Sequence, residues 1–111
     1  MTILWQPHYP PFRDGGIPDI QDFNVLPPFR RQGIGTALLD RAEQIVAERS
    51  PVVGIGVGLY ADYGAAQCLY ARRGYIPDGR GLMYNDEPVE RGESIMVDDA
   101  LTLYFARRLV P

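Results

Sequence analysis

The sequence predicts a single domain of mixed α/β class, with helices packed on a central mixed sheet that is mostly antiparallel. The chain has 111 residues, a length typical of one domain, so we expect residues 1–111 to form one unit. Hydrophobic residues make up 46% and charged residues 23%, close to the average of globular proteins. Short apolar segments alternate with amphipathic ones, as they do when strands and helices share one core.

Helices are expected where apolar residues recur at spacings of three and four. This pattern runs over 33–49, which Ser50-Pro51 ends, and over 65–73, where Gly74 suits a left-handed helix end. Strands are expected in short apolar or alternating runs bounded by proline or glycine. In chain order, we expect a strand at 2–5, an irregular loop over 6–18, a strand at 19–26, the helix 33–49, a strand at 52–59, the helix 65–73, a strand over 75–84 with a turn at Asp78-Gly79, a hairpin-like connection over 85–93 and a last strand around 101–105.

Composition and charge exclude several classes of function. The formal net charge of −3 disfavours nucleic acid as a partner, because a polyanion binder needs a basic surface. No apolar stretch approaches the ~20 residues of a membrane span and no signal peptide is recognisable, so we expect a cytoplasmic protein without a membrane partner. No Cys/His set has metal-ligand spacing, so no metal site is expected. Cys68 is expected to be a small packing residue, and Asp98-Asp99 a solvated turn.

The segment Arg30-Arg31-Gln32-Gly33-Ile34-Gly35-Thr36 joins the end of a predicted strand to the start of the helix 33–49. The first turn of a helix has backbone N–H groups without intrahelical partners, and the helix dipole favours an anion there. Gly33 and Gly35 remove the side chains that would keep a diphosphate away, and the two arginines add positive charge. We therefore predict a phosphate or diphosphate site; tight helix–sheet packing is the alternative reason for the two glycines.

A second segment, Leu69-Tyr70-Ala71-Arg72-Arg73-Gly74-Tyr75, follows later in the chain. Together with the segment 30–35, it resembles the GNAT family of N-acetyltransferases over about residues 18–80. The resemblance implies a GNAT-like fold, acetyl-CoA as the acyl donor, and transfer of the acetyl group to a primary amine. Relative to the family, the chain looks shortened at its N-terminus, where further strands and helices are usual.

The resemblance also implies roles for individual residues. Tyr70 corresponds to the acid that protonates the leaving thiolate, and Asp19 to the position of a base that deprotonates the amine. Tyr63 stands where family members often carry a cofactor-contacting asparagine. The implied cofactor-binding residues are Val25, Leu26, Arg30, Arg31, Gln32, Gly33, Ile34, Gly35, Thr36 and Tyr63, with Val25 and Leu26 facing the pantetheine arm and Arg31 to Thr36 holding the pyrophosphate.

Each of these roles has a structural alternative. Tyr70 is otherwise a packed aromatic of the second helix, and Asp19 an exposed aspartate at a strand end. Tyr60 and Tyr63 are otherwise acceptor-site or packing aromatics. The glycines at 54, 56 and 58 fit either a strand that splays to admit the cofactor or a tightly packed strand.

The leading functional hypothesis is an acetyl-CoA-dependent N-acetyltransferase that works in a ternary complex, since no nucleophile for a covalent intermediate is evident. The alternatives are a non-catalytic acyl-CoA-binding or interaction module and, less favoured, another nucleotide-phosphate-binding protein. Because the first strand lacks its usual neighbours, we also expect a homodimer, with the strand 2–5 or the last strand at the interface.

Overall fold

The computed structural model describes residues 1–21 and 33–109, and within this part the strands form one sheet. The strand order is β1-β2-β3-β6-β4-β5. The strands β2 and β3 are parallel, and every other neighbouring pair is antiparallel. The predicted mixed, mostly antiparallel sheet is thus confirmed. The strands are β1 (Thr2–Leu4), β2 (Asp19–Gln21), β3 (Val52–Gly58), β4 (Ile76–Tyr84), β5 (Glu87–Pro88) and β6 (Leu101–Arg108).

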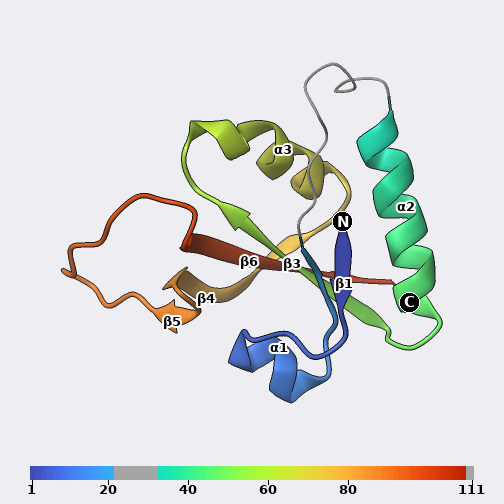
Figure 1. Ribbon diagram of the computed structural model, residues 1–111, viewed down its shortest axis with the longest axis horizontal. Helices are drawn as coiled ribbons and strands as arrows, with labels where there is room; N and C mark the ends of the chain where they lie inside the picture. Colours follow the sequence, from blue (N-terminus) through green and yellow to red (C-terminus); the bar gives the residue numbers. More distant parts are fainter. Residues whose placement is uncertain (22–32, 110–111) are drawn as a thin grey trace.

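Helices cover both faces of the sheet (Figure 1). The helices α2 (Ile34–Ala47) and α3 (Gly64–Arg72) lie on one face, and a 3₁₀ turn at Ala61–Tyr63 leads into α3. The short helix α1 (Pro10–Gly15) lies on the opposite face. None of the helices in the described part of the chain is both long and apolar enough to cross a membrane.

The strand β3 separates two apolar cores, because successive side chains point to opposite faces. Val53, Ile55 and Val57 belong to the larger core, which α2 and α3 cover. On the other face, the ring of Phe12 from α1 lies against Gly54, where a Cβ atom would come within 2.2 Å of it. Tyr104 of β6 belongs to this smaller core and stacks on Tyr9, with ring centroids 3.8 Å apart.

The segment 6–18 differs from the expected irregular loop, since it contains α1. Its prolines begin this helix, because the first helical position needs no backbone donor and favours the φ angle that proline fixes. Gly16, at φ 68°, ends it in the left-handed conformation. The expected strand 19–26 is confirmed for residues 19–21, and residues 22–26 lie outside the described part.

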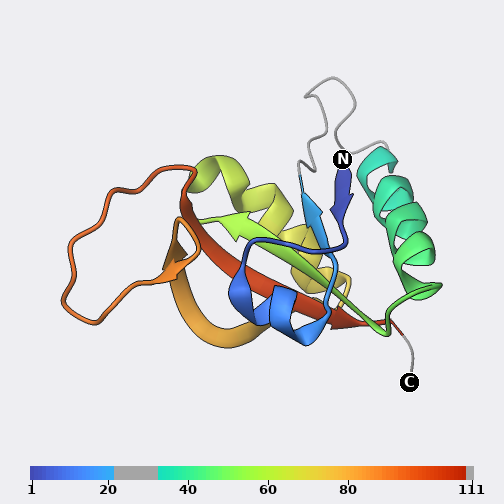
Figure 2. The ribbon, with the colours of Figure 1, turned by 60° about the horizontal axis from the view of Figure 1, so that its bottom comes forward.

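Two expectations for the last third of the chain need correction. The turn at Asp78-Gly79 is a bulge inside β4, where the pairing with β6 shifts between Pro77 and Leu82. The last strand, β6, extends to Arg108 and lies between β3 and β4. The hairpin-like connection is confirmed at β4–β5, where Asn85 and Asp86 both adopt positive φ angles as a tight hairpin turn requires. Figure 2 shows the following connection to β6 projecting from the body of the protein.

A buried carboxylate ties α2 to the sheet and to the end of α3. Glu43 of α2 is 8% exposed and accepts hydrogen bonds from three side chains. Arg73 donates at 2.6 and 3.2 Å, Arg107 of β6 at 2.7 Å, and the Tyr75 hydroxyl at 2.7 Å. Loss of the carboxylate would therefore leave two guanidinium groups and a phenol without their shared acceptor.

We expect Glu43→Ala to destabilise the fold by about 3 kcal/mol, because it breaks a buried ion pair, leaves Arg107 without its carboxylate and leaves Arg73 paired only with Asp40. Urea unfolding followed by circular dichroism measures this difference. Glu48→Ala, an exposed carboxylate just after the same helix, is the matched control and should cost well under 1 kcal/mol. Equal losses in the two variants would show that the network around Glu43 does not hold α2 in place.

Candidate active site

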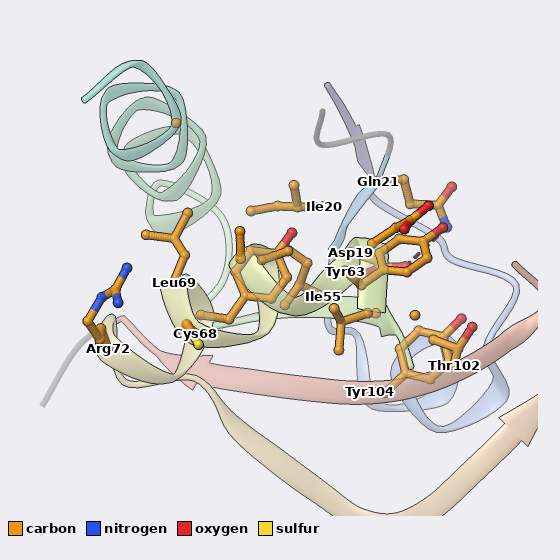
Figure 3. Close-up of a pocket in the computed structure, with 18 of the residues that line it drawn as sticks. Asp19, Ile20, Gln21, Ile55, Tyr63, Cys68, Leu69, Arg72, Thr102 and Tyr104 are labelled. Carbon is orange, nitrogen blue, oxygen red and sulfur yellow. Dashed lines mark hydrogen bonds between the residues drawn. The ribbon is translucent and has the colours of Figure 1, made fainter. Parts of the chain in front are cut away.

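The two parallel strands end at the same edge of the sheet, and this edge carries the principal pocket of the described chain. The segment that leads to α2 begins after β2, and α3 follows β3, so the N-terminal ends of both helices come to this edge. Crevices at the carboxyl ends of parallel strands are the usual ligand sites of such sheets. The pocket has a volume of about 960 Å³, and β2, β3, β6, α3 and the start of α2 line it (Figure 3).

The N-terminus of α2 opens into this pocket through Gly35 and Thr36, with Gly33 beside them. Gly33 is the N-cap at φ 77°, and among the described residues no side chain caps the helix. The first backbone N–H to find an intrahelical acceptor is that of Ala37, which donates to the Gly33 oxygen at 3.0 Å. No described residue accepts a hydrogen bond from the N–H groups of Gly35 and Thr36, an arrangement that suits the anion predicted from the sequence.

Other predicted cofactor residues cannot be placed. Ile34 begins α2, but the position of its side chain is not described. The predictions for Val25, Leu26, Arg30, Arg31 and Gln32 lie outside the described residues.

Asp19 of β2 lines the pocket and is buried, with 1% of its surface exposed. Gln21 donates a hydrogen bond to its Oδ2 at 3.1 Å, while Oδ1 has no partner among the residues that the structure describes. Burial raises the pKa of this carboxyl to about 7, against the smaller lowering effect of the bond from Gln21. The alternative prediction, an exposed aspartate at a strand end, is therefore wrong. The burial and the raised pKa suit a base that works near neutral pH.

Tyr70 combines the two interpretations of its role. Its side chain is 3% exposed and packs in the core of α2 and α3, with its ring 5.8 Å from that of Tyr75. The residue also lines the pocket. Burial raises the pKa of the phenol above its usual value, and the charge of Asp19 raises it further. Tyr70 therefore keeps its proton at neutral pH, and its pKa depends on the charge of the candidate base, Asp19.

Comparison with known families agrees with this arrangement. A family model described as the acetyltransferase (GNAT) domain matches residues 5–77. The chain belongs to the GNAT acetyltransferase family. No curated protein and no solved structure matches it significantly.

The GNAT match runs from the end of β1 into β4, so it includes Asp19, the start of α2 and Tyr70. The pocket wall contributed by β6 and by the connection before it lies beyond the matched residues. There the chain supplies Asp99, Thr102 and Tyr104. The family match therefore gives no information on these three residues of the pocket wall.

Three other tyrosines of the pocket donate hydrogen bonds to carboxylates. Tyr104 donates to Asp86 at 2.5 Å. Tyr63 donates to Asp99 at 2.7 Å, and Tyr60 donates to the same oxygen. The pair Asp98-Asp99 is thus more than a solvated turn, since Asp99 holds both tyrosines. The cofactor contact of Tyr63 stays a prediction, and its ring also fills the space that a side chain at position 58 would need.

Sequence reasoning missed several residues of the GNAT pocket. Arg72 is exposed and lines the pocket from the last turn of α3. Arg72 follows Leu69 by three residues, so both lie on one face of the helix. This spacing could have identified Arg72 as a pocket residue. Asp99 gave no such signal, because it follows Tyr63 by 36 residues and the course of β6 brings them together. Cys68 is exposed in the pocket wall and not a packing residue.

Proposed function

We propose that the protein transfers an acetyl group from acetyl-CoA to a primary amine, with both substrates bound at once. One observation carries this proposal: a single pocket contains the N-terminus of α2 at one part of its wall and the buried carboxylate of Asp19 at another. The first suits a diphosphate, and the second suits the removal of a proton from an ammonium group.

The described residues fit the phosphate end of acetyl-CoA. The N–H groups around Gly35 and Thr36 would bind the diphosphate. Arg72 adds a guanidinium group on the facing helix, and among the described residues no acidic side chain pairs with it. Arg30 and Arg31 would add charge, and Val25 and Leu26 would hold the pantetheine arm, as the GNAT resemblance implies.

The chemistry assigns a separate step to each of the two buried groups. Asp19 accepts a proton from the ammonium group, and the resulting amine nitrogen attacks the thioester carbon. A carbon–nitrogen bond forms and the carbon–sulfur bond breaks, while the Tyr70 hydroxyl gives its proton to the leaving sulfur. The second proton lost by the nitrogen restores Tyr70, so the products are the amide, CoA and one released proton. No histidine lies beside Cys68 in the described wall, which favours direct attack over a thioester on the protein.

The test is amine-dependent release of CoA, followed with a thiol reagent. The assay should use Cys68→Ser, because the exposed thiol of Cys68 would itself react. Release with at least one primary amine supports the transferase. Tight binding of acetyl-CoA without release for any amine would indicate the non-catalytic acyl-CoA module. Calorimetric binding of ATP but not of CoA would indicate a different nucleotide-binding protein.

Tyr70→Phe should lower kcat by about 100-fold with little change in the affinity for CoA. The variant keeps the packed ring and removes only the hydroxyl, so the core around Tyr75 stays filled. Steady-state kinetics and calorimetric titration of CoA measure the two effects. An unchanged kcat from pH 6 to pH 9 would remove Tyr70 from the mechanism and leave it a packing residue.

We also propose a homodimer formed through β1, and we expect twice the monomer mass of 12.4 kDa by light scattering coupled to size exclusion. In the described sheet, β1 pairs only with β2, so its outer edge can pair with another chain. The last strand, β6, lies between β3 and β4 in the described sheet, so β1 is the better candidate for such edge pairing. Thr2→Lys should give the monomer, since a charge on an edge strand opposes pairing. A parent chain that runs as a monomer at micromolar concentration would contradict the dimer.

A further inference from the structure

The two ends of the pocket differ in charge. Figure 3 shows Leu69, Cys68 and Arg72 of α3 at one end, and Asp19, Gln21 and Tyr63 gathered toward the other. In the described wall, Arg72 is the one basic residue, whereas three aspartates line the pocket: Asp19, Asp62 and Asp99. The end away from Arg72 therefore favours a cation rather than a second anionic group.

Asp99 is held in place by the two tyrosines. The hydroxyls of Tyr60 and Tyr63 both donate to its Oδ1, and the two rings meet nearly at right angles, with centroids 5.0 Å apart. These hydrogen bonds lower the pKa of Asp99, so the carboxylate stays charged. Its other oxygen has no hydrogen-bond partner among the described residues. An ionised carboxylate beside two phenol rings is a setting that binds ammonium groups, through charge and through the ring faces.

Asp19 provides the second, independent indication of a cation. It lines the same pocket, is almost fully buried, and leaves Oδ1 without a partner in the described part of the chain. Asp19 pairs with Gly54, while the ring of Tyr63 covers Gly58, four residues further along β3. At about 3.3 Å per residue, these two backbone positions are roughly 13 Å apart. A monoamine has one ammonium group for these two carboxylates, whereas an extended chain with several amino groups can place one at each.

We propose that the acceptor is a linear polyamine, with its reacting amino group at Asp19 and a second ammonium group held by Asp99, Tyr60 and Tyr63. This inference rests on the proposed transferase function and adds the substrate class to it. The side chains of Thr102 and Tyr104 lie over Gly56 and the ring of Tyr63 lies over Gly58, so the methylene chain would pass along these side chains rather than over the glycines.

The test compares the binding of spermidine and hexylamine by calorimetry, in the presence of CoA so that no transfer occurs. We expect spermidine to bind at least about tenfold more tightly, because hexylamine has no second charge for Asp99. Asp99→Asn should weaken spermidine binding by about tenfold. Glu87→Gln removes one charge from an exposed position outside the pocket and is the matched control, with an expected change below about twofold.

A second variant keeps the test decisive if Asp99→Asn does not fold. Tyr63→Phe retains the ring over Gly58 and removes one of the bonds that hold Asp99, so it should weaken spermidine binding severalfold. Equal affinities for spermidine and hexylamine would overturn the inference. An effect of Glu87→Gln as large as that of Asp99→Asn would also overturn it, because binding would then follow only the net charge.

These results separate the substrate class from the activity itself. Amine-dependent release of CoA with no preference for spermidine would leave the transferase and remove the polyamine acceptor. Spermidine binding that depends on Asp99, in a chain that releases no CoA with any amine, would contradict the transferase and leave a polyamine site.

Discussion

Gly35→Glu should weaken CoA binding severely in a chain that still folds. Gly35 lies in the first turn of α2 and lines the pocket, where the backbone N–H groups have no intrahelical acceptors. A carboxylate at this position would occupy the place of the diphosphate and repel it, and it would itself satisfy the dipole of the helix. Glutamate is also a good helix former, so the substitution should not disrupt α2. We expect a loss of affinity of at least about 100-fold.

Calorimetric titration of CoA into the parent and the variant measures this loss, and circular dichroism verifies the fold. Gly35→Gln is the matched control, because glutamine has nearly the same size without the charge. It should bind CoA more weakly than the parent and more tightly than the glutamate variant. A folded Gly35→Glu variant with the parent's affinity would mean that the diphosphate does not lie at the start of α2.

Asp19→Asn should lower kcat/KM by about 100-fold or more, the usual scale for loss of a general base. In the parent, only the ionised carboxylate can accept the proton, and its pKa lies at about 7. The parent's kcat/KM should therefore rise with pH and level off above about pH 7, and the variant should lack this rise. A variant that keeps the parent's rate and pH profile would exclude Asp19 as the base.

The same substitution should change the pH dependence of stability. The folded protein holds the Asp19 proton up to about pH 7, whereas the unfolded chain releases it near the ordinary aspartate pKa of 3.8. Stability from this group is therefore complete below about pH 4 and is lost as the pH rises toward 7. From pH 5 to pH 8, the parent should lose roughly 3 kcal/mol relative to Asp19→Asn. Urea unfolding at both pH values tests this, with the exposed Asp14→Asn as control.

The main elements could be predicted because their sequences are locally consistent. The helix over 33–49 has regular apolar spacing, and the strand over 52–59 is apolar, short and bounded by a proline. The helix α1 was missed because Pro10 and Pro11 can start a helix as well as interrupt one. Gly79 and Gly81, which both adopt positive φ angles, give the bulge in β4 a local signal, but the segment 75–84 does not specify the pairing with β6 that makes it a bulge instead of a turn.

The candidate site was predictable where it follows a motif and hidden where it depends on burial or on distant strands. The start of α2 and Tyr70 belong to the two segments that carry the GNAT resemblance. The burial that raises the pKa of Asp19 comes from the surrounding fold, which the sequence around position 19 does not reveal. The cluster of Tyr60, Tyr63 and Asp99 joins the entry to α3 to the chain just before β6, so only the tertiary structure brings it together.

The most direct test of the account is to find where the acetyl group goes. Acetyl-CoA with an isotopically labelled acetyl group would be incubated with the protein and either spermidine or hexylamine, and the small molecules and the intact protein would be analysed by mass spectrometry. We predict label on the amine in an amount equal to the CoA released, and none on the protein. Label on Cys68 before it reaches the amine would contradict direct attack, and labelled acetate without acetylated amine would contradict the transferase.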